Sequence, residues 1–360
     1  MTYDIAIIGG GIAGAALAAE VAPHARVLIL EAEDAPGYHA TGRSAAFWEE
    51  TYGGPGVQPL SSASRAALAA GGFLQPLGSL HIGRAGEADQ IDAMLARFAG
   101  TGVELSLVDP RERLAGLRPE WSLAIWEPSC AYIDVAGLHA ACLSRARKAG
   151  AEMVLNGRVT ALARSGGRWT IDTAAGRFEA DIVVDAAGAW ADGVAALAGA
   201  RPLGITPLRR TLVQLRVDPP VPASAPHVAH IGGDFYFKPE AGGRVWVSPH
   251  DEIPSPPCDA QPEELDVAIA IDRLEQAVDW KVERLERSWA GLRSFAPDRL
   301  PVYGFDPVVP GFFWCAGQGG FGIQTAPAAA MLGAALLMGR TPPPAVSGID
   351  ADRYAPGRFG

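Results

Sequence analysis

The sequence is poor in cysteine, and its four cysteines are scattered without a CxxC pair. They are Cys130, Cys142, Cys258 and Cys315. This spacing predicts neither a disulfide framework nor a metal site, and it favours a reducing compartment. The N-terminus also lacks a basic leader followed by an apolar stretch, so we expect a cytoplasmic protein.

Positive charge is scarce as well, with 30 Lys and Arg against 40 Asp and Glu and a formal charge of -10. Such a surface repels a phosphate backbone, so nucleic acid is not an expected partner. The most apolar late segment, Ala326 to Met338, has about thirteen residues, whereas a membrane-spanning helix needs roughly 20. We expect a buried helix there and no transmembrane segment, which leaves peripheral membrane contact open.

The N-terminus carries a nucleotide-binding pattern. The aliphatic run Asp4 to Ile8 predicts a buried strand, and Gly9, Gly11 and Gly14 follow with GxGxxG spacing. A small-residue helix then continues to Val21, and its N-terminus is suited to a pyrophosphate. Ile12 and Ala13, which open this helix, join the three glycines as predicted cofactor contacts.

A second strand, Arg26 to Leu30, ends at Glu31, about twenty residues after the glycines, where a carboxylate can bind a ribose 2′-hydroxyl. In a chain with 43 glycines the spacing alone could mark an ordinary tight turn. Strand, helix, second strand and acid together favour an adenosine diphosphate group without a 2′-phosphate. The pattern does not by itself separate NAD from FAD.

The loop after the second strand reads Pro36-Gly37-Tyr38-His39-Ala40-Thr41-Gly42-Arg43-Ser44-Ala45-Ala46. Here the sequence resembles the D-amino acid oxidase and glycine oxidase superfamily of flavoenzymes, and most of all bacterial catabolic D-amino acid dehydrogenases of the D-arginine type. The resemblance implies FAD, bound without a covalent link. It also implies that this loop runs past the pyrophosphate towards the flavin, with contacts from His39, Thr41, Gly42, Arg43, Ser44 and Ala45.

Two further segments resemble flavin motifs of that superfamily. Asp181 to Trp190 is an aliphatic strand that runs into a glycine turn, and it implies contacts from Ala187, Gly188 and Trp190. Near the C-terminus, Phe313 to Thr325 is a strand, a glycine-rich turn and a helix, a combination that can hold the flavin pyrimidine edge. The resemblance assigns cofactor contacts there to Gly319, Gly320, Phe321, Gly322, Ile323, Gln324 and Thr325. Val159 matches a backbone contact to adenine.

Oxidation of an amino acid needs an anchor for the substrate carboxylate, which a guanidinium supplies through two parallel hydrogen bonds. Arg293 lies in an apolar stretch that looks like the family's W-x-G-x-R segment, so it is the first choice over an internal salt bridge. By strand alternation only one of Arg209 and Arg210 faces the pocket, and the resemblance favours Arg210. It also places Tyr236, Tyr52 and the carbonyl of Gly320 at the substrate.

The sequence departs from the arginine-oxidising subgroup on the substrate side. Phe47 stands where that subgroup has a histidine, and Ser79 stands where an acid would grip a cationic side chain. Glu49 and Glu50 are acids close by that could compensate. We therefore predict oxidative deamination of neutral or apolar D-amino acids to 2-oxo acids and ammonia. Alternatives are a glycine or sarcosine oxidase, an NAD-dependent dehydrogenase and a non-catalytic flavin-binding protein. The electron acceptor, a quinone or oxygen, is left open.

The predicted fold class is α/β, with a Rossmann-type FAD-binding domain of glutathione-reductase-like topology and an antiparallel substrate domain. We assign residues 1–51, 138–205 and 288–345 to the FAD-binding domain. Residues 52–137 and 206–287 form the substrate domain, and residues 346–360 form a C-terminal tail.

Overall fold

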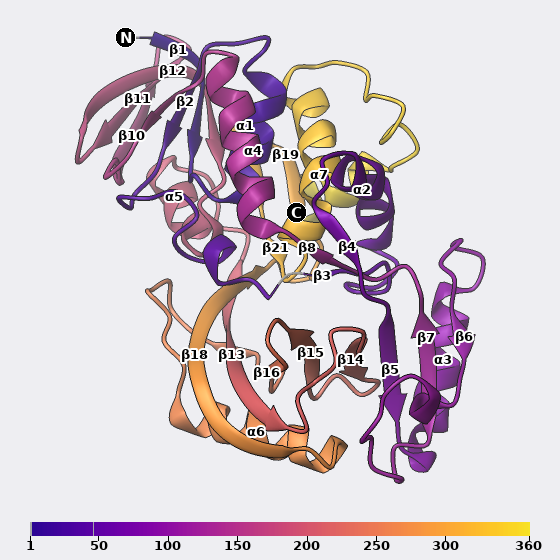
Figure 1. The fold of residues 1–360 in the computed structure, drawn as a ribbon. Helices are drawn as coiled ribbons and strands as arrows, with labels where there is room; N and C mark the ends of the chain where they lie inside the picture. Colours follow the sequence, from indigo (N-terminus) through magenta and orange to yellow (C-terminus); the bar gives the residue numbers. More distant parts are fainter. Residues whose placement is uncertain (1, 46) are drawn as a thin grey trace.

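The computed structural model describes residues 2–45 and 47–360, and one of its two large sheets has eight strands (Figure 1). The main path of this sheet runs β10-β11-β12-β1-β2-β9, while β20 pairs with β12 and β19 pairs with β20. Parallel pairing joins β12, β1, β2 and β9 in that order and β12 to β20. The strands are β1 (Thr2–Ile8), β2 (Val27–Leu30), β9 (Glu152–Val154), β10 (Val159–Ser165), β11 (Arg168–Thr173), β12 (Gly176–Asp185), β19 (Val302–Phe305) and β20 (Phe312–Ala316).

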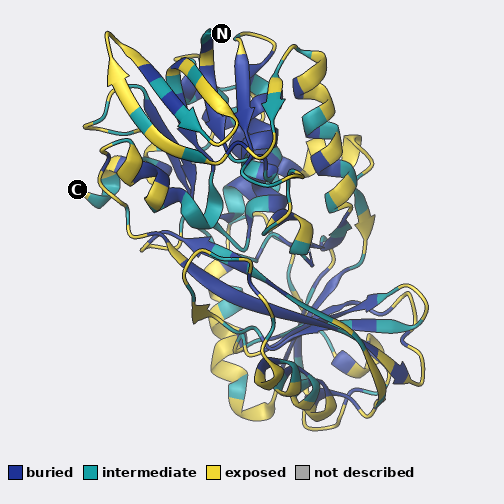
Figure 2. Cartoon of the chain, turned by 90° about the vertical axis from the view of Figure 1, so that its left-hand side faces the viewer, coloured by how far each residue is buried: buried dark blue, intermediate teal, exposed yellow. Residues whose placement is uncertain are grey.

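Helices cover both faces of this sheet, because alternate residues of β1 point to opposite sides. Ile5 and Ile7 share a buried cluster with α1 (Ile12–Val21), α4 (Val135–Lys148) and α7 (Gly322–Leu337). Ala6 and Ile8 share another with α5 (Ala191–Leu197). Figure 2 shows the result, with dark blue strands between helices whose outer faces are yellow. The predicted strand-glycine-helix unit is therefore confirmed, and α7 is the buried helix expected near the C-terminus.

The second large sheet has ten strands, in the order β21-β18-β13-β16-β15-β14-β5-β7-β6, with β17 beside β13. Helix α6 (Glu264–Ala277) packs on one face of it. The strands are β5 (Ser79–Gly83), β6 (Ser106–Leu107), β7 (Leu123–Glu127), β13 (Thr206–Asp218), β14 (His227–His230), β15 (Tyr236–Glu240), β16 (Arg244–Ser248), β17 (Ile253–Pro254), β18 (Lys281–Phe295) and β21 (Gln318–Gly319). The predicted fold class, with a nucleotide-binding sheet and a largely antiparallel second sheet, is confirmed.

The long antiparallel pair of β13 and β18 sets the geometry between the two sheets. Its register runs from Thr206 opposite Phe295 to Asp218 opposite Lys281. Irregularities occur only between Gln214 and Leu215 and between Arg216 and Val217, so the pairing is regular at the end nearest β21. Val213, Leu215 and Val217 on β13 share a buried cluster with α6. Residues of the other parity, Arg210 and Leu212, line a cavity.

A three-stranded sheet joins these parts, in the order β3 (Phe47–Trp48), β8 (Ala131–Ile133) and β4 (Leu74–Pro76). Helices α2 (Gln58–Ala70) and α3 (Ala88–Phe98) complete the fold. Within the described residues no helix combines the length and apolar character needed to cross a membrane.

Residues 346–360 are more firmly packed than the expected surface tail. Val346 is 1% exposed and Tyr354 is fully buried. The Tyr354 hydroxyl donates a hydrogen bond of 2.8 Å to the Gly56 carbonyl. Helix α7 ends at Leu337, the triproline at 342–344 follows, and the chain then folds back onto the protein.

Candidate active site

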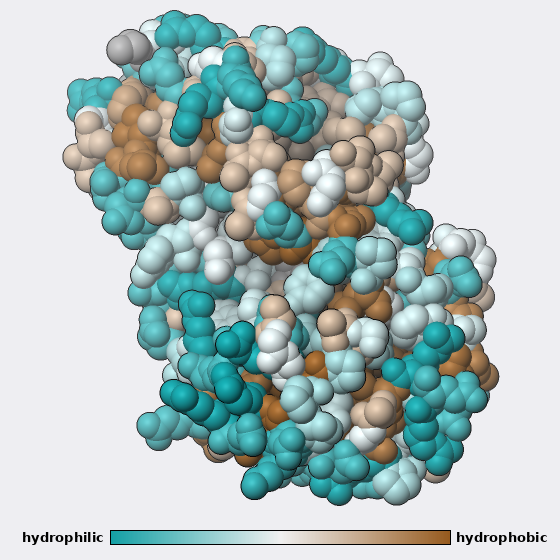
Figure 3. Space-filling model, in the orientation of Figure 1, coloured by the Kyte–Doolittle hydropathy of each residue, from teal (hydrophilic) through white to brown (hydrophobic). Residues whose placement is uncertain are grey.

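An elongated cavity of about 460 Å³ lies where the glycine turns of the first sheet meet β13 and β18. Hydrophobic residues also reach the surface at the waist between the two parts of the molecule (Figure 3). The cavity brings together residues that were predicted from distant segments. They are Gly9, Gly11, Ile12, Ala13, Glu31, His39, Thr41, Arg43, Ser44, Ala45, Val159, Ala187, Gly188, Trp190, Arg210, Arg293, Gly319, Gly320, Gly322 and Ile323.

The first glycine turn is shaped by close backbone contacts. Gly9 has a φ of +110°, and a Cβ there would lie 2.3 Å from the Ala186 carbonyl oxygen in the second turn. A Cβ on Gly14 would lie 2.0 Å from the Gly9 oxygen. Gly14 does not line the cavity and brings α1 close to the turn, and its predicted cofactor contact stays a prediction.

Glu31 and Val159, which the sequence predicts at the adenosine of a dinucleotide, both line the cavity. Glu31 is 8% exposed, and one of its oxygens accepts a 2.8 Å hydrogen bond from the Gly10 amide. The other accepts one of 3.0 Å from the Glu33 amide. This carboxylate therefore holds the glycine turn in place while it lines the cavity. The sequence argument missed Glu33, which also lines it.

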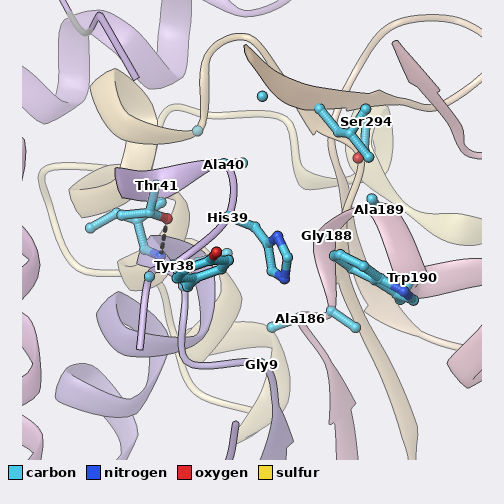
Figure 4. A pocket seen from close by; sticks show the side chains of 18 of the residues that line it. Gly9, Tyr38, His39, Ala40, Thr41, Ala186, Gly188, Ala189, Trp190 and Ser294 are labelled. Atoms are coloured by element: carbon cyan, nitrogen blue, oxygen red, sulfur yellow. Dashed lines mark hydrogen bonds between the residues drawn. The ribbon is translucent and has the colours of Figure 1, made fainter. Parts of the chain in front are cut away.

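The loop that carries His39 and Thr41 is fastened to the start of α1. The Thr41 hydroxyl accepts a 3.0 Å hydrogen bond from the Ile12 amide, drawn as a dashed line in Figure 4. The His39 ring lies 4.6 Å from the Trp190 ring, and its Nε2 lies 3.1 Å from Glu33. His39 Nδ1 is buried and has no hydrogen-bond partner within residues 2–45 and 47–360. A polar group of a bound cofactor can satisfy it.

Arg43 is not free to act on a cofactor by its charge. It forms an ion pair with Asp259 and donates to the carbonyls of Ala260 at 2.8 Å and Ala290 at 3.2 Å. Its guanidinium thus ties the loop to the segment after β17 and to β18, while its stem lines the cavity. Gly42, which lies outside the lining, allows a tight turn, because a Cβ there would lie 2.8 Å from the Gly37 oxygen.

The C-terminal glycine motif meets the cavity through only part of its length. Gly319, Gly320, Gly322 and Ile323 line it, whereas Phe321, Gln324 and Thr325 do not. Phe321 packs against other rings, and Thr325 donates to the Phe321 carbonyl at 2.9 Å. Gln324 is 1% exposed and bonds to protein atoms only. Successive residues of a helix face different directions, so these three side chains lie outside the lining, and their predicted cofactor contacts stay predictions.

Arg293 stands at one end of the cavity between two phenols. Its Nη1 donates to the Tyr52 hydroxyl at 2.7 Å, and its Nη2 donates to the Tyr236 hydroxyl at 3.2 Å. In the part of the chain that the structure describes, no carboxylate forms an ion pair with Arg293. A cation held by two neutral oxygens beside a cavity is suited to an anion. The structure thus brings together three predicted substrate residues.

Gly320 lies directly against this group. A Cβ on Gly320 would lie 2.2 Å from the Tyr52 hydroxyl and 3.2 Å from Arg293 Nη1. Any side chain at this position would displace the phenol that the arginine binds. The absence of a side chain is therefore a requirement of the arginine-tyrosine arrangement.

The two adjacent arginines face opposite sides of β13. Arg210 lines the cavity, donates to the Asp251 carbonyl at 2.7 Å and to Glu252 at 3.2 Å, and is 2% exposed. Burial lowers the pKa of Arg210 to about 10, and the nearby charge of Arg293 is the second cause of this shift. Its Nη1 has no hydrogen-bond partner among the described residues. Arg209 instead forms ion pairs with Glu263 and Asp266.

The two residues predicted for the substrate side-chain pocket behave differently. The Phe47 ring lies 5.4 Å from Tyr52 and 5.7 Å from Tyr236, so it contacts both phenols that hold Arg293. Ser79 is fully buried outside the cavity lining, and its hydroxyl lies 3.0 Å from His227 Nδ1. The pocket role of Ser79 therefore stays a prediction.

Ser79 belongs to a buried polar cluster that sequence spacing did not reveal, together with Glu49, His81, Glu127 and His227. His81 Nε2 lies 3.5 Å from Glu49 and 3.4 Å from Glu127. Burial alone would raise the pKa of Glu49, but His81 and hydrogen bonds from His227 and Ser79 lower it to about 2. The cluster's atoms are close enough to hold an ion, although no metal-ligand spacing predicted it.

A Rossmann-type sheet whose glycine turns surround one cavity, with an anion-binding arginine at its end, defines an oxidoreductase that binds a dinucleotide cofactor. The sequence model of one protein family, described as FAD dependent oxidoreductase, matches residues 4–336. The chain therefore belongs to that family. FAD is accordingly its cofactor. The cradle fits this group, because glycine turns line it and His39 Nδ1 offers an unused polar atom.

Individual relatives show how far the similarity extends. Glycine oxidase of Geobacillus kaustophilus is 29% identical over 364 residues, which cover 93% of each chain. Its crystal structure covers 98% of both chains with a TM-score of 0.85 and 25% identity. The structure of L-proline dehydrogenase from P. horikoshii matches with a TM-score of 0.87 at 23% identity, covering 99% and 98%. L-2-hydroxyglutarate dehydrogenase of Salmonella houtenae is 29% identical over 219 residues, which are 56% of this chain and 51% of that protein.

Proposed function

We propose that the protein oxidatively deaminates D-amino acids with neutral or apolar side chains to 2-oxo acids and ammonia. The observation that carries this proposal is the Arg293 guanidinium, which lies at the end of the cofactor cavity and is held by two phenols without an acidic partner. An α-carboxylate matches a planar guanidinium through two hydrogen bonds. The Tyr52 and Tyr236 hydroxyls accept from Arg293 and can each donate their own proton to the same carboxylate.

Bound FAD supplies the two-electron acceptor. The chain's own residues bind and orient the substrate. With the carboxylate fixed at Arg293, the Cα-H and the amine are turned towards the cofactor side of the cavity, where the Gly320 carbonyl can accept a hydrogen bond from the amine. The lone pair of the neutral amine forms the C=N bond as the Cα hydrogen leaves with its electron pair, which gives an iminium, and water then converts the iminium into the 2-oxo acid and an ammonium ion. A neutral amine needs no side-chain base for this step.

The surroundings of the clamp support an apolar side chain. Phe47 belongs to a buried cluster with Ala45, Leu212 and Tyr236, and Trp246 and Trp289 pack against it. None of these side chains offers a charge to offset the burial of a cationic group. Glu49, an acid in this region, is 3% exposed and lies 3.6 Å from His227. The centre of the His227 ring is 4.1 Å from that of Phe47, and the two rings are tilted by 34°.

A glycine or N-methylglycine oxidase is the second candidate, and the observation that favours it is the glycine oxidase relative that covers 93% of this chain. The family match removes the NAD-dependent alternative. Both remaining candidates use the carboxylate clamp, so only substrates can separate them.

An anaerobic screen of flavin reduction tests the proposal. The substrates are D- and L-leucine, D- and L-methionine, D-phenylalanine, D-arginine, glycine and sarcosine, each followed by the loss of flavin absorbance. We expect the apolar D-amino acids to reduce the flavin fastest. Faster reduction by glycine or sarcosine would favour the second candidate, and reduction only by the L-enantiomers would refute the proposed handedness. Reoxidation of the reduced protein by air or by a soluble quinone then identifies the acceptor.

A further inference from the structure

The segment from Glu49 to Tyr52 delivers one half of the arginine clamp. It follows β3 and forms a tight turn, in which the Tyr52 amide donates to the Glu49 carbonyl at 3.4 Å. The Tyr52 hydroxyl then reaches Arg293 Nη1 at 2.7 Å. Tyr52 is therefore placed by this short turn, and the turn itself must be held by its neighbours.

Gln324 holds both ends of the turn from the first sheet's side. It lies in the first turn of α7, two positions after Gly322, which lines the cofactor cavity. Its Oε1 accepts from the Glu49 amide at 3.2 Å, and its Nε2 donates to the Tyr52 carbonyl at 3.2 Å. Nε2 also donates to the Ser61 hydroxyl at 2.7 Å. The carboxamide thus uses its acceptor and both donors inside the protein.

Glu127 holds the middle of the same turn from the second sheet. It ends β7 and is fully buried. Its Oε1 accepts from the amides of Glu50 at 2.7 Å and Thr51 at 3.4 Å. Its Oε2 accepts from the Thr51 hydroxyl at 2.6 Å. Backbone groups of the turn that would otherwise be buried without partners are thereby satisfied.

We propose that Gln324 and Glu127 are positioning residues that set the Tyr52 hydroxyl against Arg293, so that a substrate carboxylate meets a preformed clamp. This inference rests on the proposed function, because it assigns the clamp to a carboxylate. One residue comes from the helix that follows the cofactor-lining glycines and the other from the opposite sheet. The place of Tyr52 therefore depends on both halves of the molecule. Displacing a binding group by about 1 Å can lower a rate on the order of 100-fold.

The test measures binding of 4-methylpentanoate, which is leucine without its amine, by isothermal calorimetry and by the shift it causes in flavin absorbance. We expect Gln324→Ala to weaken its binding by about 10-fold or more, the scale expected when one buried hydrogen-bonded anchor is lost. Gln324→Glu keeps the acceptor for the Glu49 amide but sets a buried carboxylate oxygen against the Tyr52 carbonyl, so it should weaken binding at least as much as Gln324→Ala. Gln276→Ala is the matched control. That amide donates to Asp272 on the surface of α6 and should leave binding unchanged.

A double-mutant cycle with Tyr52→Phe separates positioning from a general structural effect. If Gln324 acts through the Tyr52 hydroxyl, Gln324→Ala should change binding less than about twofold once that hydroxyl is gone. An equal loss in both backgrounds would overturn the inference. Should Gln324→Ala fail to retain FAD, Gln324→Glu takes its place in the cycle. Glu127→Gln is tested in a second double-mutant cycle with Tyr52→Phe. A smaller loss of binding in the Tyr52→Phe background would support its positioning role, and an equal loss in both backgrounds would refute it.

The binding measurement needs no turnover, so it is independent of the proposed reaction. A wild-type protein that binds the carboxylate and shows the coupling, but is reduced by no amino acid, would refute the function and keep the positioning role. Flavin reduction by D-amino acids without coupling between Gln324 and Tyr52 would keep the function and refute the positioning role.

Discussion

Replacement of Arg293 by methionine is the most direct perturbation of the candidate active site. The side chain keeps its length and loses its charge, so the substrate carboxylate loses two charge-assisted hydrogen bonds. Tyr52 and Tyr236 remain as neutral donors, which softens the loss. We expect a cost on the order of 2 to 4 kcal/mol in transition-state binding, or roughly 30- to 1000-fold in kcat/KM. Arg293→Lys should recover only part of it, because a point charge lacks the planar fork.

The assay is anaerobic flavin reduction by D-leucine in a stopped-flow instrument, with FAD content and thermal unfolding measured on the same samples. FAD should stay bound, because separate glycine turns hold it. Stability should not fall, since this half-buried cation has no ion-pair partner among the described residues. Arg287→Met on the same strand, where the side chain is exposed, is the control. Near-native kinetics of Arg293→Met would remove this residue from the mechanism, and loss of FAD would reassign it to the cofactor.

Three further predictions follow from other groups. Heat or acid denaturation should release FAD into the supernatant, and flavin retained on the precipitated chain would show a covalent link. Gly320→Ala should keep FAD but raise KM for D-leucine, because the new Cβ would lie 2.2 Å from the Tyr52 hydroxyl; an unchanged KM would contradict this. Burial lowers the pKa of Lys238 to about 7, so the folded chain binds fewer protons than the unfolded chain between about pH 7 and 10.5. Lys238→Met should therefore raise the free energy of unfolding most below pH 7, and this gain should shrink as pH rises to 10.5. Urea unfolding of both proteins at about pH 6.5 and pH 10 measures the gain, and an equal gain at the two pH values would contradict the prediction.

The nucleotide half of the site could be predicted from sequence because its signals are local. Strand, glycines, helix and Glu31 lie within one short stretch, and the structure keeps them together around the cavity. Strand alternation with the family resemblance likewise identified Arg210 rather than Arg209 as the cavity residue. Arg293 was found through its motif, and its two phenol partners lie on segments far away in the chain.

What could not be predicted depends on which way a side chain points and on distant pairing. Gln324 and Thr325 share a motif with residues that line the cavity, but their positions on α7 turn them into the protein. Glu49 follows β3 and Glu127 ends β7, and these strands belong to different sheets. The two residues come together because the sheets meet at this turn. No spacing in the sequence records such a meeting, so the positioning role of Glu127 emerged only from the fold.

The regular pairing of β13 with β18 also bears on how this chain can change over evolutionary time. Arg210 faces the cavity and Arg209 faces α6 only because their strand keeps its register opposite Leu292 and Gly291. Loss or gain of one residue between Thr206 and Val213 would exchange the two arginines and turn Leu212 away from the cavity. Beyond Gln214 the irregular pairs already absorb such shifts. Insertions and deletions among descendants of this chain should therefore be tolerated beyond Gln214, at the end of the strand pair away from the arginines. Selection should remove them near Arg209 and Arg210.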